Sequence, residues 1–325
     1  MIAEILQLQF FIFSNMKYTY PFLIFSTFWF ACTRETEIVI PAEASKLVIN
    51  GYFSPDSTWK IKVNKTIGIL DSSRNISAIS NALVVISSDN STLNDTLSYV
   101  NGVYISAQKP KIGQSYTLKV EVKGFSSVTA SDKIPMFPAE LSGRLDVSSK
   151  VILNSVLLIP TEYHPLPIML KDPVSEHNFY KCVTNLYDKN WLKTDSIRRE
   201  ANFERQSLTS QDPSVLRFHQ EQDFMLFDDK LFADNVRNLL GLAPTSLFYP
   251  NQISLGIPLE SQKRNVEVYL DTWSMSENMY LYEKSYYTQQ FNRPDPFSEP
   301  NNIFTNVKNG YGIFAGYQRK KVRVF

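Results

Sequence analysis

The chain has 325 residues, of which 43% are hydrophobic and 13% aromatic, and its formal net charge is +1. A chain of this length and composition can bury a sizeable core, as one large domain or two ordinary ones. The near-neutral charge offers no basic field for nucleic acid, so we expect no nucleic-acid partner. With 2 cysteines in all, the fold must be held by its core rather than by a disulfide framework.

Residues 1–31 have the composition of a secretory signal peptide. Residues 18–31 are apolar, and Lys17 precedes them as the positive residue with which such signals begin. At about 1.5 Å per residue this apolar run spans about 21 Å, short of the roughly 30 Å hydrocarbon core, so no transmembrane helix is expected. Met16 is a candidate functional start, with the preceding residues lying upstream of it.

Cys32 follows Ala31 directly, at the position where bacterial lipoprotein signals are cut and the cysteine thiol is acylated. Acyl chains contribute roughly 0.8 kcal/mol per buried CH₂, so they would hold a water-soluble domain on a membrane. The sequence therefore predicts a lipidated Cys32, and a buried or free thiol is the alternative. Residues 32–45 show no apolar periodicity beyond the cysteine and are interpreted as a solvated tether.

From Lys46 to Pro135 the sequence has the two-residue alternation of half-buried β-strands. Short runs rich in β-branched and aromatic residues follow one another, among them LVINGYF, ALVVISS and SYTLKVEV. The pair Asn101-Gly102 predicts a type I′ hairpin, because both residues tolerate positive φ. No helical stretch interrupts these runs. Residues 46–135 are therefore predicted to form an immunoglobulin-like or transthyretin-like β-sandwich.

Residues 136–325 are predicted to form a second β-rich domain with long loops. Strand-like runs such as FYKCVTNLYD and NVEVYLDTW are separated by long polar stretches. One amphipathic helix is expected near 275–291, with Ser274 and Glu277 as its capping box. A stripe at helical spacing is interpreted as a core face against a sheet. It comprises Met275, Met279, Tyr282 and Tyr286.

No catalytic constellation can be identified in the sequence, and no enzyme activity, cofactor or metal is expected. Ser57 and Lys60 match the S-x-x-K pattern but lack the companion motifs of a serine hydrolase. The histidines are not at metal-ligand spacing and are expected in loops or at the surface: His164, His177 and His219. An acidic cluster without the spacing or glycine of a calcium loop is interpreted as solvated: Asp223, Asp228, Asp229 and Asp234.

Several stretches together resemble one family. The cysteine-led start with KLVINGYFS, the NALVVISSD and NGVYIS region, GQSYTLKVEV, SENMYLYEKSYY and EPNNIFTNVKNGYGIFAGY are similar to Bacteroidota lipoproteins grouped as domain of unknown function 4249. The resemblance runs from Cys32 to about Tyr317, and Glu299 to Tyr317 is its most specific piece. It implies an outer-membrane lipoprotein, commonly produced alongside TonB-dependent receptors, with no established activity and no defined catalytic residues. Glu35 and Glu37 also resemble the acid-rich signals that send such lipoproteins to the cell surface.

Two candidate functions are consistent with the sequence. A hydrolase that uses Ser57 is a third candidate with less support. The first is a lipid-anchored outer-membrane subunit that docks on a β-barrel, such as a TonB-dependent transporter or the machinery that assembles outer-membrane proteins. The second is a stand-alone surface lipoprotein that captures a glycan or peptide. Aromatic side chains would form the contact surface in either case, although most aromatics in a β-rich chain belong to its core. The candidates are Trp191, Trp273, Tyr286, Tyr287 and Phe291.

Overall fold

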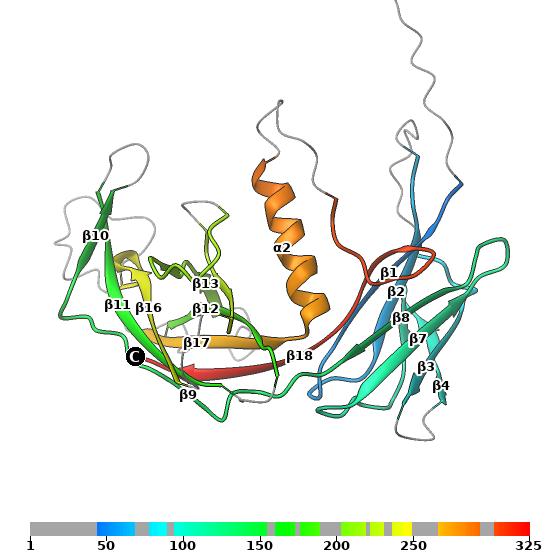
Figure 1. Cartoon of the computed structure of the whole chain (residues 1–325), viewed down its shortest axis with the longest axis horizontal. Coiled ribbons are helices and arrows are strands. Elements are labelled where there is room, and N and C mark those ends of the chain that lie inside the picture. The colour runs from blue at the N-terminus through cyan, green and yellow to red at the C-terminus, as the bar shows by residue number, and fades with distance from the viewer. Residues whose placement is uncertain are drawn as a thin grey trace, which may run out of the picture. The chain divides into compact units, whose positions relative to one another are not determined.

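The computed structural model describes ten stretches of the chain, all within one compact unit, Ala44–Phe325 (Figure 1). The protein is mainly β, as predicted, and the strands of the described residues form three sheets. The predicted signal peptide, Cys32 and the export residues Glu35 and Glu37 lie outside the described residues. The described stretches are 44–68, 78–89, 94–154, 160–172, 176–188, 203–218, 222–230, 236–248, 266–292 and 302–325.

The N-terminal strands build a β-sandwich, the architecture predicted for this part of the chain. One layer has the strand order β1-β2-β6-β5, and the other has the order β4-β3-β7-β8. Neighbouring strands within both orders are antiparallel. The strands are β1 (Leu47–Phe53), β2 (Lys60–Lys65), β3 (Leu83–Ser88), β4 (Asn94–Thr96), β5 (Ser98–Val100), β6 (Val103–Ile105), β7 (Ser115–Glu121) and β8 (Val128–Lys133).

Alternation of side chains decides which face of each strand meets the other layer. In β7, Tyr116 and Val120 are buried, whereas Lys119 between them is exposed. Trp59 is completely buried beside Tyr116, with 4.8 Å between the ring centroids. The turn between β5 and β6 has φ values of 48° at its Asn and 86° at its Gly, which confirms the predicted Asn-Gly hairpin.

The second β-rich part places two further layers against each other. A five-stranded sheet has the order β10-β11-β16-β14, and β9 also pairs with β11. The facing layer has the order β13-β12-β17-β18, and β15 also pairs with β12. The elements are β9 (Glu140–Gly143), β10 (Val151–Asn154), β11 (Pro160–Lys171), β12 (Phe179–Asp188), β13 (Phe203–Gln206), β14 (Thr209–Ser210), β15 (Met225–Asp228), β16 (Val236–Pro244), the 3₁₀-helix η3 (Thr245–Phe248), β17 (Val266–Met275) and β18 (Tyr311–Arg323).

Strand β12 separates two cores because its side chains alternate. Tyr180 and Cys182 join the core beneath the five-stranded sheet, whereas Phe179 and Val183 join the core beneath α2 (Glu277–Asn292). Burial raises the pKa of the Cys182 thiol to about 12, so the thiol stays protonated at neutral pH. The helix therefore covers the opposite face of this layer (Figure 1), which confirms that its inner side packs on a sheet.

The last strand, β18, links the sandwich to the second β-rich part. It pairs in parallel with β1 and antiparallel with β17, so one sheet runs through both parts. Gly312 lies at this junction with a φ of 106°, and a Cβ there would collide with the Ile49 carbonyl oxygen. The domain boundary near residue 135 stays a prediction. The structure shows that one sheet extends across the two parts on either side of it.

Candidate functional site

Helix α2 begins at a serine where three segments of the chain meet. Ser276 Oγ accepts a hydrogen bond from the Met279 N–H at 3.2 Å and donates one to the Asp132 carboxylate. The predicted capping box of Ser274 and Glu277 is wrong, because pairing with β18 carries β17 through Ser274. The helix therefore starts after Ser276, and Glu277 contributes its negative charge to the first turn.

A buried ion pair holds α2 against the sheet. Lys181 Nζ lies 2.6 Å from Glu283 Oε2 and donates a hydrogen bond to the Tyr287 hydroxyl at 3.2 Å. The Lys181 and Glu283 side chains are 9% and 15% exposed, and the ammonium lies 4.9 Å from the centre of the Phe224 ring. Because both side chains are largely removed from water, each charge is stabilised mainly by the other and by the neighbouring ring. The ion pair lies on the side of α2 that faces the sheet, where Met279 and Tyr280 of the helix are also buried.

A row of aromatic rings runs along α2 and onto the neighbouring β1. Successive ring centroids are 5.5 to 6.4 Å apart, so the rings form a continuous surface. Tyr286 is 41% exposed and Tyr52 is 39% exposed, whereas the other rings are half-buried. We call this row the aromatic strip, and it comprises Tyr52, Tyr282, Tyr286, Tyr287 and Phe291.

The structure brings together three of the five aromatic residues predicted as contact candidates. Tyr286, Tyr287 and Phe291 are neighbours within the aromatic strip. Trp273 is not part of the strip: it lies on β17, packs against the same core as Tyr287, and has the Arg319 guanidinium over its ring at 4.6 Å. Trp191 lies outside the described residues.

The helical stripe predicted as a core face is buried only in part. Met279 is 6% exposed in the core, and Met275 is also in that core but belongs to β17 rather than to the helix. Tyr286 is exposed, because the ion pair turns Glu283 and Tyr287 toward the sheet, and these residues share one face at a spacing of four. The end of the predicted stripe is therefore surface, not core.

Sequence reasoning missed two members of the strip. Tyr52 alternates with the buried Gly51 and Phe53, so strand periodicity alone could have placed it on the outer face of β1. Tyr282 is predicted as part of a core face, and its half-buried ring does pack against that core while also belonging to the strip. The contact between these two rings depends on the parallel pairing of β1 with β18, for which the sequence carries no local signal.

A polar cluster surrounds the end of β15, where a solvated acidic segment was expected. Asp229 accepts a hydrogen bond from the Asn178 N–H at 2.8 Å and lies 3.2 Å from His177 Nε2. Its side chain is 12% exposed, so the solvated interpretation is wrong for Asp229. Asp234 lies outside the described residues. In the part of the chain that the structure describes, no group of three or more His, Cys, Asp and Glu side chains could hold a metal ion.

The remaining chemical candidates do not assemble. His164 is only 6% exposed within β11, and its Nδ1 lies 3.0 Å from a backbone carbonyl oxygen, so the surface expectation is wrong for this residue. His177 lies in the loop before β12, and His219 lies outside the described residues. Ser57 lies in a bend before β2 and forms no hydrogen bond with the exposed Lys60, although both residues are described.

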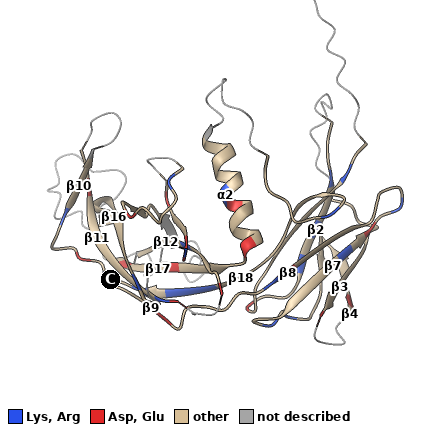
Figure 2. Ribbon diagram, in the orientation of Figure 1, with Lys and Arg blue, Asp and Glu red and all other residues tan. Residues whose placement is uncertain are grey.

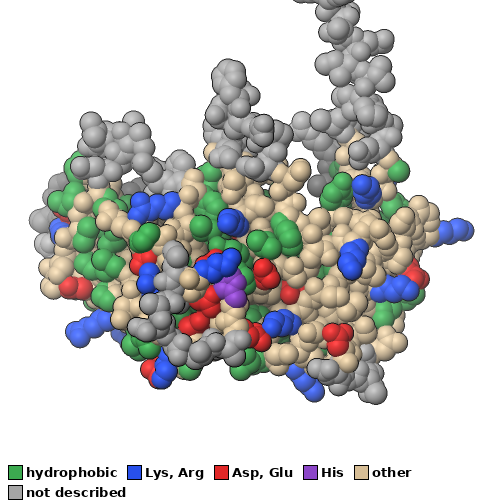
Figure 3. Space-filling model, in the orientation of Figure 1, with side chains coloured by type: hydrophobic (Ala, Val, Ile, Leu, Met, Phe, Trp, Pro, Cys, Tyr) green, Lys and Arg blue, Asp and Glu red, His purple; other side chains and the backbone are tan. Residues whose placement is uncertain are grey.

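Exposed hydrophobic side chains also occur on the five-stranded sheet. Ile152 of β10 is 61% exposed, and Val236 and Leu240 of β16 are 44% and 48% exposed. Hydrophobic side chains accordingly reach the surface over β10, β11 and β16 (Figure 3). These three are aliphatic, whereas the aromatic strip offers flat rings in mutual contact, the more selective kind of surface.

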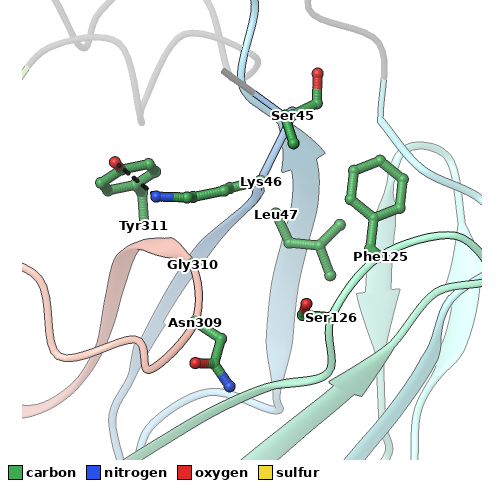
Figure 4. Close-up of a pocket in the computed structure, with 9 residues that line it drawn as sticks. Ser45, Lys46, Leu47, Phe125, Ser126, Asn309, Gly310 and Tyr311 are labelled. Atoms are coloured by element: carbon green, nitrogen blue, oxygen red, sulfur yellow. Dashed lines mark hydrogen bonds between the residues drawn. The ribbon is translucent and has the colours of Figure 1, made fainter.

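A pocket of about 450 Å³ lies at the start of β1, away from the strip (Figure 4). Lys46 extends across it, with its Nζ 5.2 Å from the centre of the Tyr311 ring and 3.4 Å from the Tyr311 hydroxyl. Phe125 and Ser126 line another side, and they come from the turn between β7 and β8. The pocket thus combines one ammonium group with hydroxyl groups and two aromatic rings.

Fold and site together define a mainly β protein in which a sandwich and a second β-rich part share one strand and present an aromatic strip. The chain belongs to the family described as a domain of unknown function, DUF4249, which matches residues 33–323. This match confirms the family resemblance. None of the curated proteins matches the chain. Among the described residues, no helix is both long and apolar enough to cross a membrane.

Proposed function

We propose that the protein is a lipid-anchored accessory lipoprotein of the outer membrane and a subunit or partner of an outer-membrane β-barrel complex, such as a TonB-dependent transporter. Acylated Cys32 is the anchor, and the protein lies on the cell surface. The apolar segment before Cys32 supports this anchor, and so does the family match, which starts at the next residue. The protein contributes a binding surface and no catalytic chemistry.

The aromatic strip is the observation that carries this proposal. Tyrosine and other aromatic residues are enriched where partners bind, because they bury a large area at a low cost in conformational entropy. The strip combines exposed rings at Tyr52 and Tyr286 with a base that the Lys181–Glu283 ion pair holds in place. A partner therefore meets a surface that is already ordered, which lowers the cost of binding.

The test is affinity purification of the tagged protein from detergent-solubilised outer membranes of its native host, followed by mass spectrometry of the intact protein and its partners. We expect an acylated Cys32 and a near-stoichiometric β-barrel protein. Tyr286→Ala combined with Phe291→Ala should release the barrel. The matched control is Tyr99→Ala, because Tyr99 is also exposed (37%) but lies on the edge strand β5.

The outcomes separate the parts of the proposal. An unacylated Cys32 would overturn the anchor, and an acylated protein recovered alone would overturn the subunit role. If the variant with both strip substitutions still binds the barrel, the strip is not part of the interface. The identity of the recovered barrel distinguishes a transporter from the outer-membrane assembly machinery.

A second function is capture of a glycan or peptide by a stand-alone surface lipoprotein. The near-parallel ring pairs Tyr282–Tyr286, at 9°, and Tyr287–Phe291, at 21°, favour it, because flat rings form platforms for sugar faces and peptide side chains. Isothermal titration of the purified protein with glycan and peptide mixtures tests it. Binding that Tyr286→Ala abolishes and Tyr99→Ala preserves, without any barrel, would favour this second function.

A further inference from the structure

The ends of several strands gather at one end of the sandwich, where the described chain begins. Leu47 at the start of β1 lies opposite Lys65 at the end of β2, and Val48 lies opposite Tyr311 at the start of β18. The turn between β7 and β8 closes the same end, and the pocket lined by Lys46 lies among these elements (Figure 4). We call this end of the sandwich the tether end.

The tether end carries exposed lysines that lack carboxylate partners. Four of them make no ion pair with any described residue: Lys46, Lys65, Lys123 and Lys308. Lys308 belongs to this end because it forms a bridge with Thr129 near the start of β8. Glu121 also lies here, but it pairs with Lys119 at 2.7 Å. Lysines occur along the sandwich strands, as the blue segments of Figure 2 show.

The carboxylates of the sandwich are concentrated toward its opposite end. Asp56 follows the end of β1, and Asp89 follows the end of β3 with its N–H bonded to the Ser115 carbonyl at the start of β7. Asp132 lies opposite Tyr116, also near the start of β7. Among the described residues, the excess of lysines over acids is therefore larger at the tether end, because Glu121 there is already paired with Lys119, whereas three acids lie toward the opposite end.

The pocket gives the tether end a site for one anionic group. The Lys46 ammonium points toward the Tyr311 hydroxyl, and Ser45 and Ser126 line other parts of the pocket (Figure 4). Tyr311 adds a ring with a polar end, the kind that is stable at the boundary between lipid and water, and Phe125 adds an apolar ring. These groups match the chemistry of a phosphate headgroup, which is anionic and rich in hydrogen-bond acceptors.

Chain length limits the distance between this end and the predicted anchor. Twelve steps along the chain separate Cys32 from Ala44, a span of at most roughly 40 Å when extended and about 20 Å as a flexible coil. An acylated Cys32 therefore holds the tether end close to the lipid surface. No other end of the sandwich is attached by so short a connection to the anchor.

We propose that the tether end docks on the anionic phosphate groups of the lipids in the membrane that holds the anchor, with the Lys46 pocket receiving one such phosphate. This inference rests on the proposed lipid anchor. Docking orients the protein and leaves the aromatic strip available for its partner. Each lysine near an anionic surface strengthens binding about fivefold at moderate salt, so four lysines supply a measurable affinity without the acyl chains.

The test uses mature protein with Cys32→Ala, so that no acyl chain contributes to binding. Its binding is measured by co-sedimentation with vesicles of phosphatidylcholine alone and of equal parts phosphatidylcholine and phosphatidylglycerol. We expect binding to the anionic vesicles only, and its loss at high salt. Changing the four tether-end lysines to Gln should weaken binding at least tenfold. The matched control changes four lysines from the opposite end to Gln and should retain binding: Lys60, Lys109, Lys111 and Lys133.

Equal loss of binding in both lysine variants would overturn the proposal, because attraction would then depend on total charge. Absence of binding to anionic vesicles would overturn it too. Circular dichroism of both variants establishes that each is folded before the comparison. Failure here is distinguishable from failure of the proposed function, because Cys32 acylation and the barrel partner are measured in native membranes and play no part in the vesicle assay.

Discussion

Asp172 shows how a single buried carboxyl couples three segments at the residue scale. The Asp172 carboxyl group accepts a hydrogen bond from the Tyr180 hydroxyl and another, at 3.4 Å, from the Asn178 side-chain amide. Burial raises the pKa of Asp172 to about 6, and the neighbouring Asp229 adds to the increase. Two carboxyl groups in contact cannot both carry a charge without cost, so the native state favours a proton at this site.

This shift predicts a pH dependence of stability. The pKa of Asp172 rises from its ordinary 3.8 to about 6 on folding, so its stabilising contribution is complete below 3.8 and is lost as pH rises through about 6. Asp172→Asn keeps the acceptor for Tyr180 and removes the titration. We therefore expect the variant to gain stability relative to the natural chain between these pH values. Urea midpoints at the two ends of that window measure it, and a constant difference would contradict it.

Lys181 illustrates a residue whose role the sequence does not reveal. In a strand flanked by hydrophobic residues a lysine reads as an exposed position, yet its ammonium is enclosed by Glu283, Tyr287 and Phe224. The burial exists because α2 covers β12, and nothing near Lys181 in the sequence specifies that helix. The burial of Asp229 likewise could not be predicted from its neighbours in the sequence, because it depends on the distant loop that carries His177 and Asn178.

At the scale of elements, α2 was predictable in its existence and approximate length but not in its start. Its sequence contains neither Gly nor Pro, and the observed helix, Glu277–Asn292, matches the range predicted from 275 to 291 within two residues. Two serines precede it, and both are candidate caps by composition. The pairing of β17 with β18 decides between them, because it holds Ser274 in the strand and leaves Ser276 to cap.

Ser276→Ala should destabilise the protein by about 1 to 3 kcal/mol. It removes the acceptor for the Met279 N–H and a donor to the Asp132 carboxylate. Thr288→Ala is the control on the same helix, because the exposed Thr288 hydroxyl donates only to the Lys284 carbonyl, and its loss should cost less than about 0.5 kcal/mol. Chemical denaturation measures both. Equal losses of unfolding free energy in the two variants would contradict the role of Ser276 as the helix cap.

At the scale of the whole molecule, β18 makes the two β-rich parts depend on each other. Its N-terminal half pairs with β1 of the sandwich, and its C-terminal half pairs with β17. Each half of β18 satisfies backbone groups of a different neighbour, so displacement of the strand leaves an unpaired edge in both parts. We therefore expect the described unit to unfold cooperatively.

Gly312→Ala tests this coupling. The added methyl group would meet the Ile49 backbone, and the φ of 106° is unfavourable for alanine, so β18 should detach from β1. We expect a loss of several kcal/mol and faster hydrogen exchange in both β1 and β17. Gly102→Ala is the control, because Gly102 has a positive φ of 86° in a turn with open space around it. Faster exchange confined to β1 would contradict the cooperative unit.

The sequence by itself determined the mainly β class, the sandwich strands, the Asn101-Gly102 hairpin, the presence of one helix late in the chain, and membership of the family. Each of these features depends on residues that are close together in the sequence or on short motifs. Hydrophobic periodicity and turn residues therefore reveal them without knowledge of the tertiary structure. Only the tertiary structure decided that Tyr52 meets Tyr282, that Lys181 lies beneath α2 and that Ser276 caps it. These contacts join segments far apart in the chain, and they depend on the parallel pairing of β1 with β18 and on the burial that this shared sheet creates.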